Sequence, residues 1–145
     1  MPSGSLARTQ ESLLWTNRIN GSFVSLAYGP LDPTKSPLFM LSCFNGMNIA
    51  VLDVRTEIAD AKPGTPLTIE LTAGGLTSPI EAEATRDEAD GVIFGEASDI
   101  EVKPILDVLR LPGLLTVKVG ETSAILSDQG RAKAVGQFSE ACQLD

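Results

Sequence analysis

The sequence predicts a mainly β protein, an antiparallel β-sandwich or flattened barrel built from hairpins, with a short helix near residues 103–110 and a C-terminal helix near 128–141. Three observations predict this class. Apolar and polar residues alternate in several runs, turn dipeptides separate the runs, and helix-like spacing of apolar residues is confined to two segments. The chain has 145 residues, 43% of them hydrophobic and 5% aromatic, so one core built mainly from aliphatic side chains is expected.

We expect residues 1–10 to be a flexible N-terminal segment or an expression remnant, and residues 11–145 to form a single β-rich domain. The opening residues lack the basic and apolar regions of a signal peptide, so they carry no information about export. The Pro-rich stretch 30–37 is short enough to be a connector within one domain.

Four dipeptides predict tight hairpin turns. Asn20-Gly21 and Asn45-Gly46 each lie between β-rich runs and favour type I′ turns, whose two central residues have positive φ. Asp90-Gly91 fits the same pattern. Gly120-Glu121 favours a type II′ turn, which has glycine at its first central position.

Alternation is clearest in two of the runs. In residues 67–72 and 80–85, every second side chain is apolar and the others are polar, as in half-buried strands of an antiparallel sheet. Counting all such runs, we expect about nine strands.

The two predicted helices have different start signals. The first carries Pro104 in its first turn, where a missing N–H costs no helical hydrogen bond, and it stops before Pro112-Gly113. The second takes Ser127 or Asp128 as its N-cap. Its predicted apolar stripe consists of Ala132, Val135, Phe138 and Cys142.

Charge and composition exclude several functions. The net charge is −8, and the 11 basic residues are spread along the chain, so we expect no nucleic acid partner and no membrane insertion. Histidine is absent, which excludes Ser-His and Cys-His nucleophiles, histidine bases and histidine-ligated zinc. We therefore expect no catalytic residue, no cofactor and no metal site.

Cys43 and Cys142 are the only cysteines. Cys43 lies in a predicted strand and Cys142 at the end of the last helix, so we expect a disulfide that attaches that helix to the sheet. The alternative is a pair of buried free thiols in a cytosolic protein, because cysteine is among the most buried residue types. A catalytic thiol is not expected, since no histidine can activate it.

The densest group of carboxylates lies between residues 81 and 96. Asp87, Glu88 and Asp90 occupy a predicted hairpin tip, and Glu81 and Glu83 lie on one strand face, about 7 Å apart. The tip lacks the spacing of an EF-hand, and Glu81 with Glu83 only weakly suggests a glycosidase pair. We interpret these five residues as an interaction surface. The single tryptophan, Trp15, is interpreted as a core or docking residue.

Two stretches together resemble a group of small exported bacterial β proteins. The residues that carry the resemblance are Leu38, Leu41, Cys43, Gly46 and Leu52, followed by Phe138 and Cys142. The group includes the type VI secretion-associated VasI-like proteins and, more distantly, the invasion-associated locus B proteins. The resemblance implies a cell-envelope protein with a Cys43–Cys142 bridge and an accessory, non-catalytic role.

The function expected from the sequence is that of a non-enzymatic envelope module, periplasmic or secreted, which binds another protein. One alternative is a cytosolic structural or assembly subunit of a larger bacterial or phage complex. A further alternative is a carbohydrate-binding or carbohydrate-active β-sandwich, which the scarcity of aromatic residues disfavours.

Overall fold

The structure, a computed structural model, describes residues 13–32, 35–44, 49–56, 58 and 61–142. Within these residues, nine strands form one antiparallel sheet in the order β1-β2-β3-β4-β7-β6-β5-β8-β9. The strands are β1 (Leu13–Asn20), β2 (Phe23–Pro30), β3 (Phe39–Phe44), β4 (Ile49–Val54), β5 (Pro66–Ala73), β6 (Leu76–Arg86), β7 (Ile93–Glu101), β8 (Leu115–Val119) and β9 (Thr122–Leu126). The predicted fold class is confirmed.

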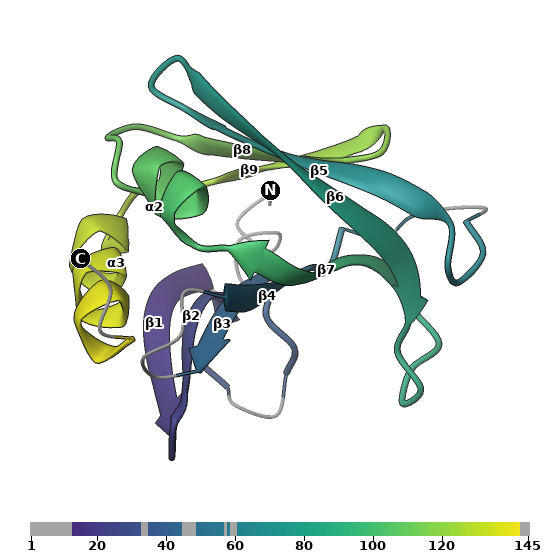
Figure 1. The fold of residues 1–145 in the computed structure, drawn as a ribbon, viewed down its shortest axis with the longest axis horizontal. Helices are drawn as coiled ribbons and strands as arrows, with labels where there is room; N and C mark the ends of the chain where they lie inside the picture. Colours follow the sequence, from purple (N-terminus) through teal and green to yellow (C-terminus); the bar gives the residue numbers. More distant parts are fainter. Residues whose placement is uncertain (1–12, 33–34, 45–48, 57, 59–60, 143–145) are drawn as a thin grey trace, which may run out of the picture.

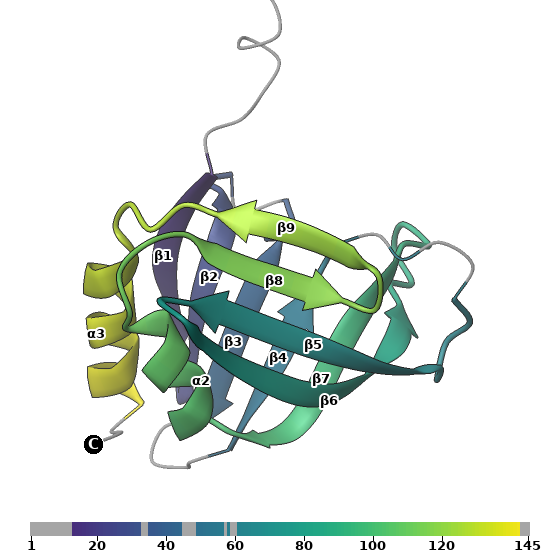
Figure 2. The same ribbon diagram turned by 90° about the horizontal axis from the view of Figure 1, so that it is seen from above.

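The sheet curls into an open half-barrel (Figures 1 and 2). Strands β1–β4 form one layer, β5, β6, β8 and β9 form the other, and β7 connects the two. The helices α2 (Lys103–Leu109) and α3 (Arg131–Ala141) both lie at one end of this half-barrel. Strands β1 and β9 are the two edges of the sheet.

The core fills the space between the two layers. Leu26, Leu41 and Leu52 from the first layer and Ile69 and Val117 from the second are completely buried in one cluster. On β5 and β8 these residues alternate with polar ones that face outward, as the sequence pattern predicts for β5. On β2 and β3 the neighbouring polar residues Ser25 and Ser42 are themselves buried, and their hydroxyl oxygens lie 2.9 Å apart in a hydrogen bond.

A side-chain hydrogen bond links the two edges of the sheet, β1 and the residue that follows β9. Trp15 on β1 is 7% exposed, and its Nε1 donates a hydrogen bond of 2.6 Å to the carbonyl oxygen of Ser127, just after β9. Its ring also packs against Tyr28 and Phe39. The interpretation of Trp15 as a core residue is confirmed.

The glycine turns agree only partly with prediction. Gly120 has φ 58° between the paired residues Val119 and Thr122, as a type II′ turn requires. At the first hairpin the register is shifted from the prediction: Asn20 pairs with Phe23, so the central residues are Gly21 and Ser22. Only Gly21 has positive φ, which makes this turn type II′ and the predicted type I′ turn wrong.

The predicted two-residue turn at Asp90-Gly91 is a longer one. Glu88–Gly91 lies between Asp87 and Val92, which are joined by a backbone hydrogen bond of 2.9 Å. Gly91 N–H then donates to the carbonyl of Asp87, at 2.8 Å. The prediction for Asn45-Gly46 falls outside the described residues.

The helix near 103–110 is confirmed as α2, whereas α3 begins three residues later than predicted. Gly130, with φ 80°, precedes it in the left-handed conformation, and neither Ser127 nor Asp128 caps it. Ser127 Oγ instead accepts the Gln129 N–H within the turn before α3, and Asp128 Oδ2 accepts the N–H of Gly113 in the loop between α2 and β8. The predicted stripe is also corrected, because Ala132 is exposed and Arg131 is buried.

Candidate functional site

The acidic residues of the predicted interaction surface separate into two groups. Asp87, Glu88 and Asp90 lie in the turn between β6 and β7, whereas Glu81 and Glu83 lie on the outward face of β6.

The carboxylates of Asp87 and Asp90 stabilise the turn itself. Asp87 Oδ1 accepts the Ala89 N–H at 2.7 Å, and Asp90 Oδ1 accepts the Val92 N–H at 2.9 Å. Asp87 also forms an ion pair with Arg55, whose guanidinium lies 4.3 Å from the centre of the Phe94 ring. The Ala89 N–H and then Arg55 lower the pKa of Asp87. These contacts explain why the turn is longer than predicted and make it a structural element, with Glu88 exposed at its tip.

The outward face of the neighbouring strands carries a row of carboxylates. Glu83 on β6 pairs with Glu96 on β7, and Glu96 pairs with Asp53 on β4. Directly opposite side chains in antiparallel strands have Cβ atoms about 4.5–5.5 Å apart, and like charges at this separation destabilise the sheet. We call Asp53, Glu96 and Glu83 the carboxylate row.

Asp53 is the most perturbed member of the row. Its burial, followed by its hydrogen bond and charge repulsion with Glu96, raises its pKa to about 7, against the opposing effect of Arg55. Asp53 Oδ1 is buried and has no hydrogen-bond partner among the residues that the structure describes. Near neutral pH the Asp53 carboxyl group is therefore partly protonated.

Sequence reasoning did not identify Asp53, which is the one polar residue in Ile49–Val54, and it did not show that Glu96 would lie beside it. That contact depends on the pairing of β4 with β7, two strands far apart in the sequence. Strand order of this kind is set by the tertiary fold, and the sequence pattern alone does not contain it.

Beyond the carboxylate row, β6 and β7 separate. Their pairing ends at Glu83–Glu96, although β6 continues back to Leu76 and β7 continues to Glu101. Figure 1 shows β6 and β7 running apart towards the end of the sheet where α2 lies. Open depressions of about 220 and 330 Å³ lie between them, and both are lined by Glu81 and Ser98. We call the space between residues 77–82 and 97–101 the β6–β7 cleft.

Two local features separate the strands. Pro79 lies in the middle of β6 and has no N–H to donate to a neighbour, so it is tolerated where a strand has an open side. On β7, the register with β4 shifts between Ala50 and Leu52, and Asp99 takes φ 54°. Such a bulge bends a strand and turns it away from its neighbour.

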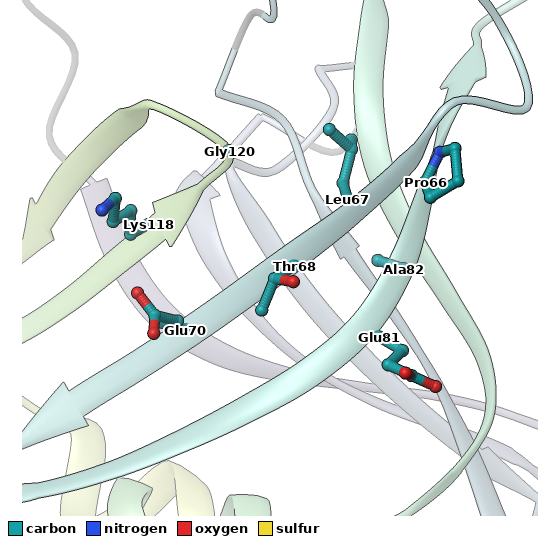
Figure 3. Close-up of a pocket in the computed structure, with 8 residues that line it drawn as sticks. All are labelled: Pro66, Leu67, Thr68, Glu70, Glu81, Ala82, Lys118 and Gly120. Atoms are coloured by element: carbon teal, nitrogen blue, oxygen red, sulfur yellow. The ribbon is translucent and has the colours of Figure 1, made fainter.

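A larger depression of about 750 Å³ lies on the outer surface of β5, β6 and β8 (Figure 3). It is open and shallow, and its charged side chains are Glu70, Glu81 and Lys118. Glu70 and Lys118 are cross-strand neighbours, while Glu81 lies on the next strand beyond Thr68. This depression therefore carries charges of both signs, whereas the depressions between β6 and β7 are lined by carboxylates alone among the charged side chains that the structure describes.

Glu81 and Glu83 are both exposed on the outward face of β6, two positions apart on that strand.

Among the described residues, no group of three or more acidic or cysteine side chains is arranged to hold a metal ion. Neither described helix has the length and apolar character needed to cross a membrane.

Cys43 and Cys142 form a disulfide with a Cα–Cα distance of 6.3 Å, and both residues are completely buried. The bond joins β3 to the end of α3 across 99 positions of sequence. The expected disulfide is thus present, and neither sulfur is a free thiol.

Comparison of the chain with protein-family models, with curated proteins and with solved structures gives no match.

Proposed function

We propose that this protein is a non-enzymatic accessory module of the bacterial cell envelope, periplasmic or secreted, which binds another protein through the outward face of β6 and β7. The observation that carries the binding role is the carboxylate row beside the β6–β7 cleft. Adjacent like charges reduce the stability of a sheet, and departures of this kind from favourable local pairing are concentrated at functional sites.

The disulfide supports the proposed compartment. A buried disulfide that joins two distant elements is typical of proteins in oxidising environments, whereas cytosolic proteins keep such thiols reduced. The resemblance to exported bacterial β proteins agrees with this assignment.

The compartment is tested on protein isolated from its native host without reductant. Free thiols are alkylated at once in denaturant, because both cysteines are buried in the folded protein, and the intact mass is measured before and after reduction. We expect no alkylation before reduction and two alkylated cysteines after it. Full alkylation before reduction would contradict an envelope location.

The binding role is tested by photo-crosslinking in the same cells. A photoreactive amino acid is introduced in place of Ser98, in the cleft, or in place of Ser123, on exposed β9. We expect a discrete protein adduct from position 98 and none from position 123. Equal adducts from both positions, or none from position 98, would contradict binding at this face.

A cytosolic assembly subunit is the second candidate, and the open edge of β9 favours it. Ile125 is 66% exposed on this edge strand, which another copy could extend by strand pairing. Sedimentation that depends on protein concentration, together with reduced thiols, would support this candidate over the envelope module.

A further inference from the structure

We propose that the β6–β7 cleft binds an extended segment of a partner protein rich in lysine or arginine, which adds as a strand to the open side of β6. This inference rests on the proposed binding role and specifies the chemistry of the partner.

The open side of β6 presents backbone hydrogen-bonding groups. Ala84 N–H donates to the carbonyl of Thr65, before β5, and Asp87 N–H donates to the carbonyl of Val92, before β7. Because successive strand residues direct these groups to opposite sides, Thr77, Pro79 and Glu81 direct theirs away from β5. The pairing with β7 has already ended there, so an incoming strand can use them.

The stretch of β6 that can pair with an added strand is short, and Pro79 lies at its centre. Thr77 and Glu81 each offer a donor and an acceptor, while Pro79 offers only its carbonyl. The stretch from Thr77 to Glu81 spans about 13 Å, enough for roughly five residues of an added strand. The missing donor of Pro79 also makes indiscriminate pairing with other strands less favourable.

The charge around the cleft selects a basic partner. Glu81, Glu83, Glu96, Asp99 and Glu101 line its two depressions, and no basic side chain in the described part of the chain does so. Lysine or arginine side chains on an added strand would offset the repulsion within this group. A second copy of this chain is disfavoured by its net charge of −8.

The probe is a synthetic ten-residue peptide of alternating lysine and threonine, titrated into the isotopically labelled protein. We expect the largest amide shifts at Thr77 and Glu81 and affinity that falls with added salt. A peptide N-methylated at alternate residues, and spermine, supply charge without the same backbone donors. Both should bind at least tenfold more weakly.

The matched variants remove two charges each. Glu81→Gln with Glu83→Gln should weaken binding of the peptide about tenfold. Glu121→Gln with Glu140→Gln removes the same charge from exposed positions elsewhere and should change affinity less than twofold. Urea unfolding checks that both double variants remain folded.

Several results would overturn the inference: no binding, equal loss in both double variants, equal affinity for spermine, or the largest shifts on β9. If the peptide fails but the Ser98 crosslink persists, the proposed function stands and the strand-addition inference falls. If position 98 yields no partner, the proposed function fails whatever the peptide does.

Discussion

At the scale of single residues, the two side chains with the most unusual surroundings are Asp53 and Arg131. Asp53 lies beside another carboxyl group and has a raised pKa. Arg131 is 1% exposed, and burial lowers its pKa although the charge of Asp128 opposes this. Each residue contacts a part of the chain that is distant in sequence: Asp53 lies beside Glu96, and Arg131 donates to the carbonyl of Leu109. Substitution of either residue therefore tests a tertiary contact.

Replacing Asp53 by Asn should change the pH dependence of stability. The pKa of Asp53 rises from 3.8 to about 7 on folding, so its contribution is fully present below pH 3.8 and is lost as the pH rises towards 7. Asp53→Asn should therefore stabilise the protein at pH 8, by on the order of 2 kcal/mol, and have little effect near pH 4.

Urea midpoints at pH 4 and pH 8 measure this effect. Glu88→Gln, which removes one carboxylate from the exposed tip, is the control and should show no comparable difference between the two pH values. A destabilising effect of Asp53→Asn at pH 8 would contradict the crowding of the two carboxyl groups.

Arg131 stabilises the junction between the two helices. Its Nε donates to the carbonyl of Leu109, the last residue of α2, at 3.0 Å, and its Nη2 donates to the carbonyl of Leu111, two residues beyond the helix. Arg131→Ala should reduce the free energy of unfolding by about 2–4 kcal/mol, because charged hydrogen bonds and packing are both lost.

Arg131→Met retains much of the packing and buries no charge, so it should cost less than Arg131→Ala. Urea unfolding of the two variants makes the comparison. An unchanged stability of Arg131→Ala would show that the helix junction does not depend on this side chain.

At the scale of elements, the disulfide explains how α3 is held at the end of the half-barrel. Phe138 and Val135 are buried against the core, and the bond from Cys142 to Cys43 fixes the end of the helix to β3. Asn17 on β1 adds a hydrogen bond of 2.9 Å from its Nδ2 to the carbonyl of Ala134. Most of these attachments are therefore to the layer formed by β1–β4.

Replacing both cysteines by alanine should destabilise the protein by about 4–5 kcal/mol, because the bond closes a loop of some 100 residues in the unfolded chain. Urea unfolding of the oxidised protein and the double variant measures this difference. In hydrogen exchange, the amides of α3 should lose more protection than those of β5 and β6. Equal loss in all three elements would argue against a local attachment role.

At the scale of the whole molecule, the sheet brings its ends together through a side chain instead of through strand pairing. Trp15 on β1 reaches the carbonyl of Ser127 after β9, 112 positions away in sequence. The edges β1 and β9 belong to different layers, so this hydrogen bond joins both layers at one end of the sheet.

Trp15→Phe removes this bond and retains an aromatic ring, so it should cost about 1–3 kcal/mol. In Trp15→Phe, the rate of hydrogen exchange should increase more in β9 than in β3, which lies within the first layer. Tyr28→Phe changes an aromatic neighbour of Trp15 without touching Ser127 and is the matched control. Identical exchange in the two variants would contradict a role of Trp15 in joining the edges.

Local sequence patterns determined most of the elements. Alternation over residues 67–72 and 80–85 predicted β5 and β6 with the correct inward faces, because the two-residue period of a strand is a local property. Turn types were less predictable. Asn20-Gly21 looks like a type I′ turn, but the pairing of Asn20 with Phe23 moves the turn by one residue, and register is a property of two strands together.

The candidate site could be predicted in part from the sequence, and the rest of it depended on the tertiary structure. The sequence by itself identified Glu81, Glu83 and the acidic turn, since carboxylates on a polar strand face and at a turn are visible in the order of residues. Only the tertiary structure decided that Asp87 and Asp90 stabilise their own turn, that Asp53 joins Glu96, and that β6 and β7 separate beyond Glu83. The physical reason is that hydrogen bonds and charge repulsion act over a few ångströms in space, and strand order brings together residues that the sequence holds far apart.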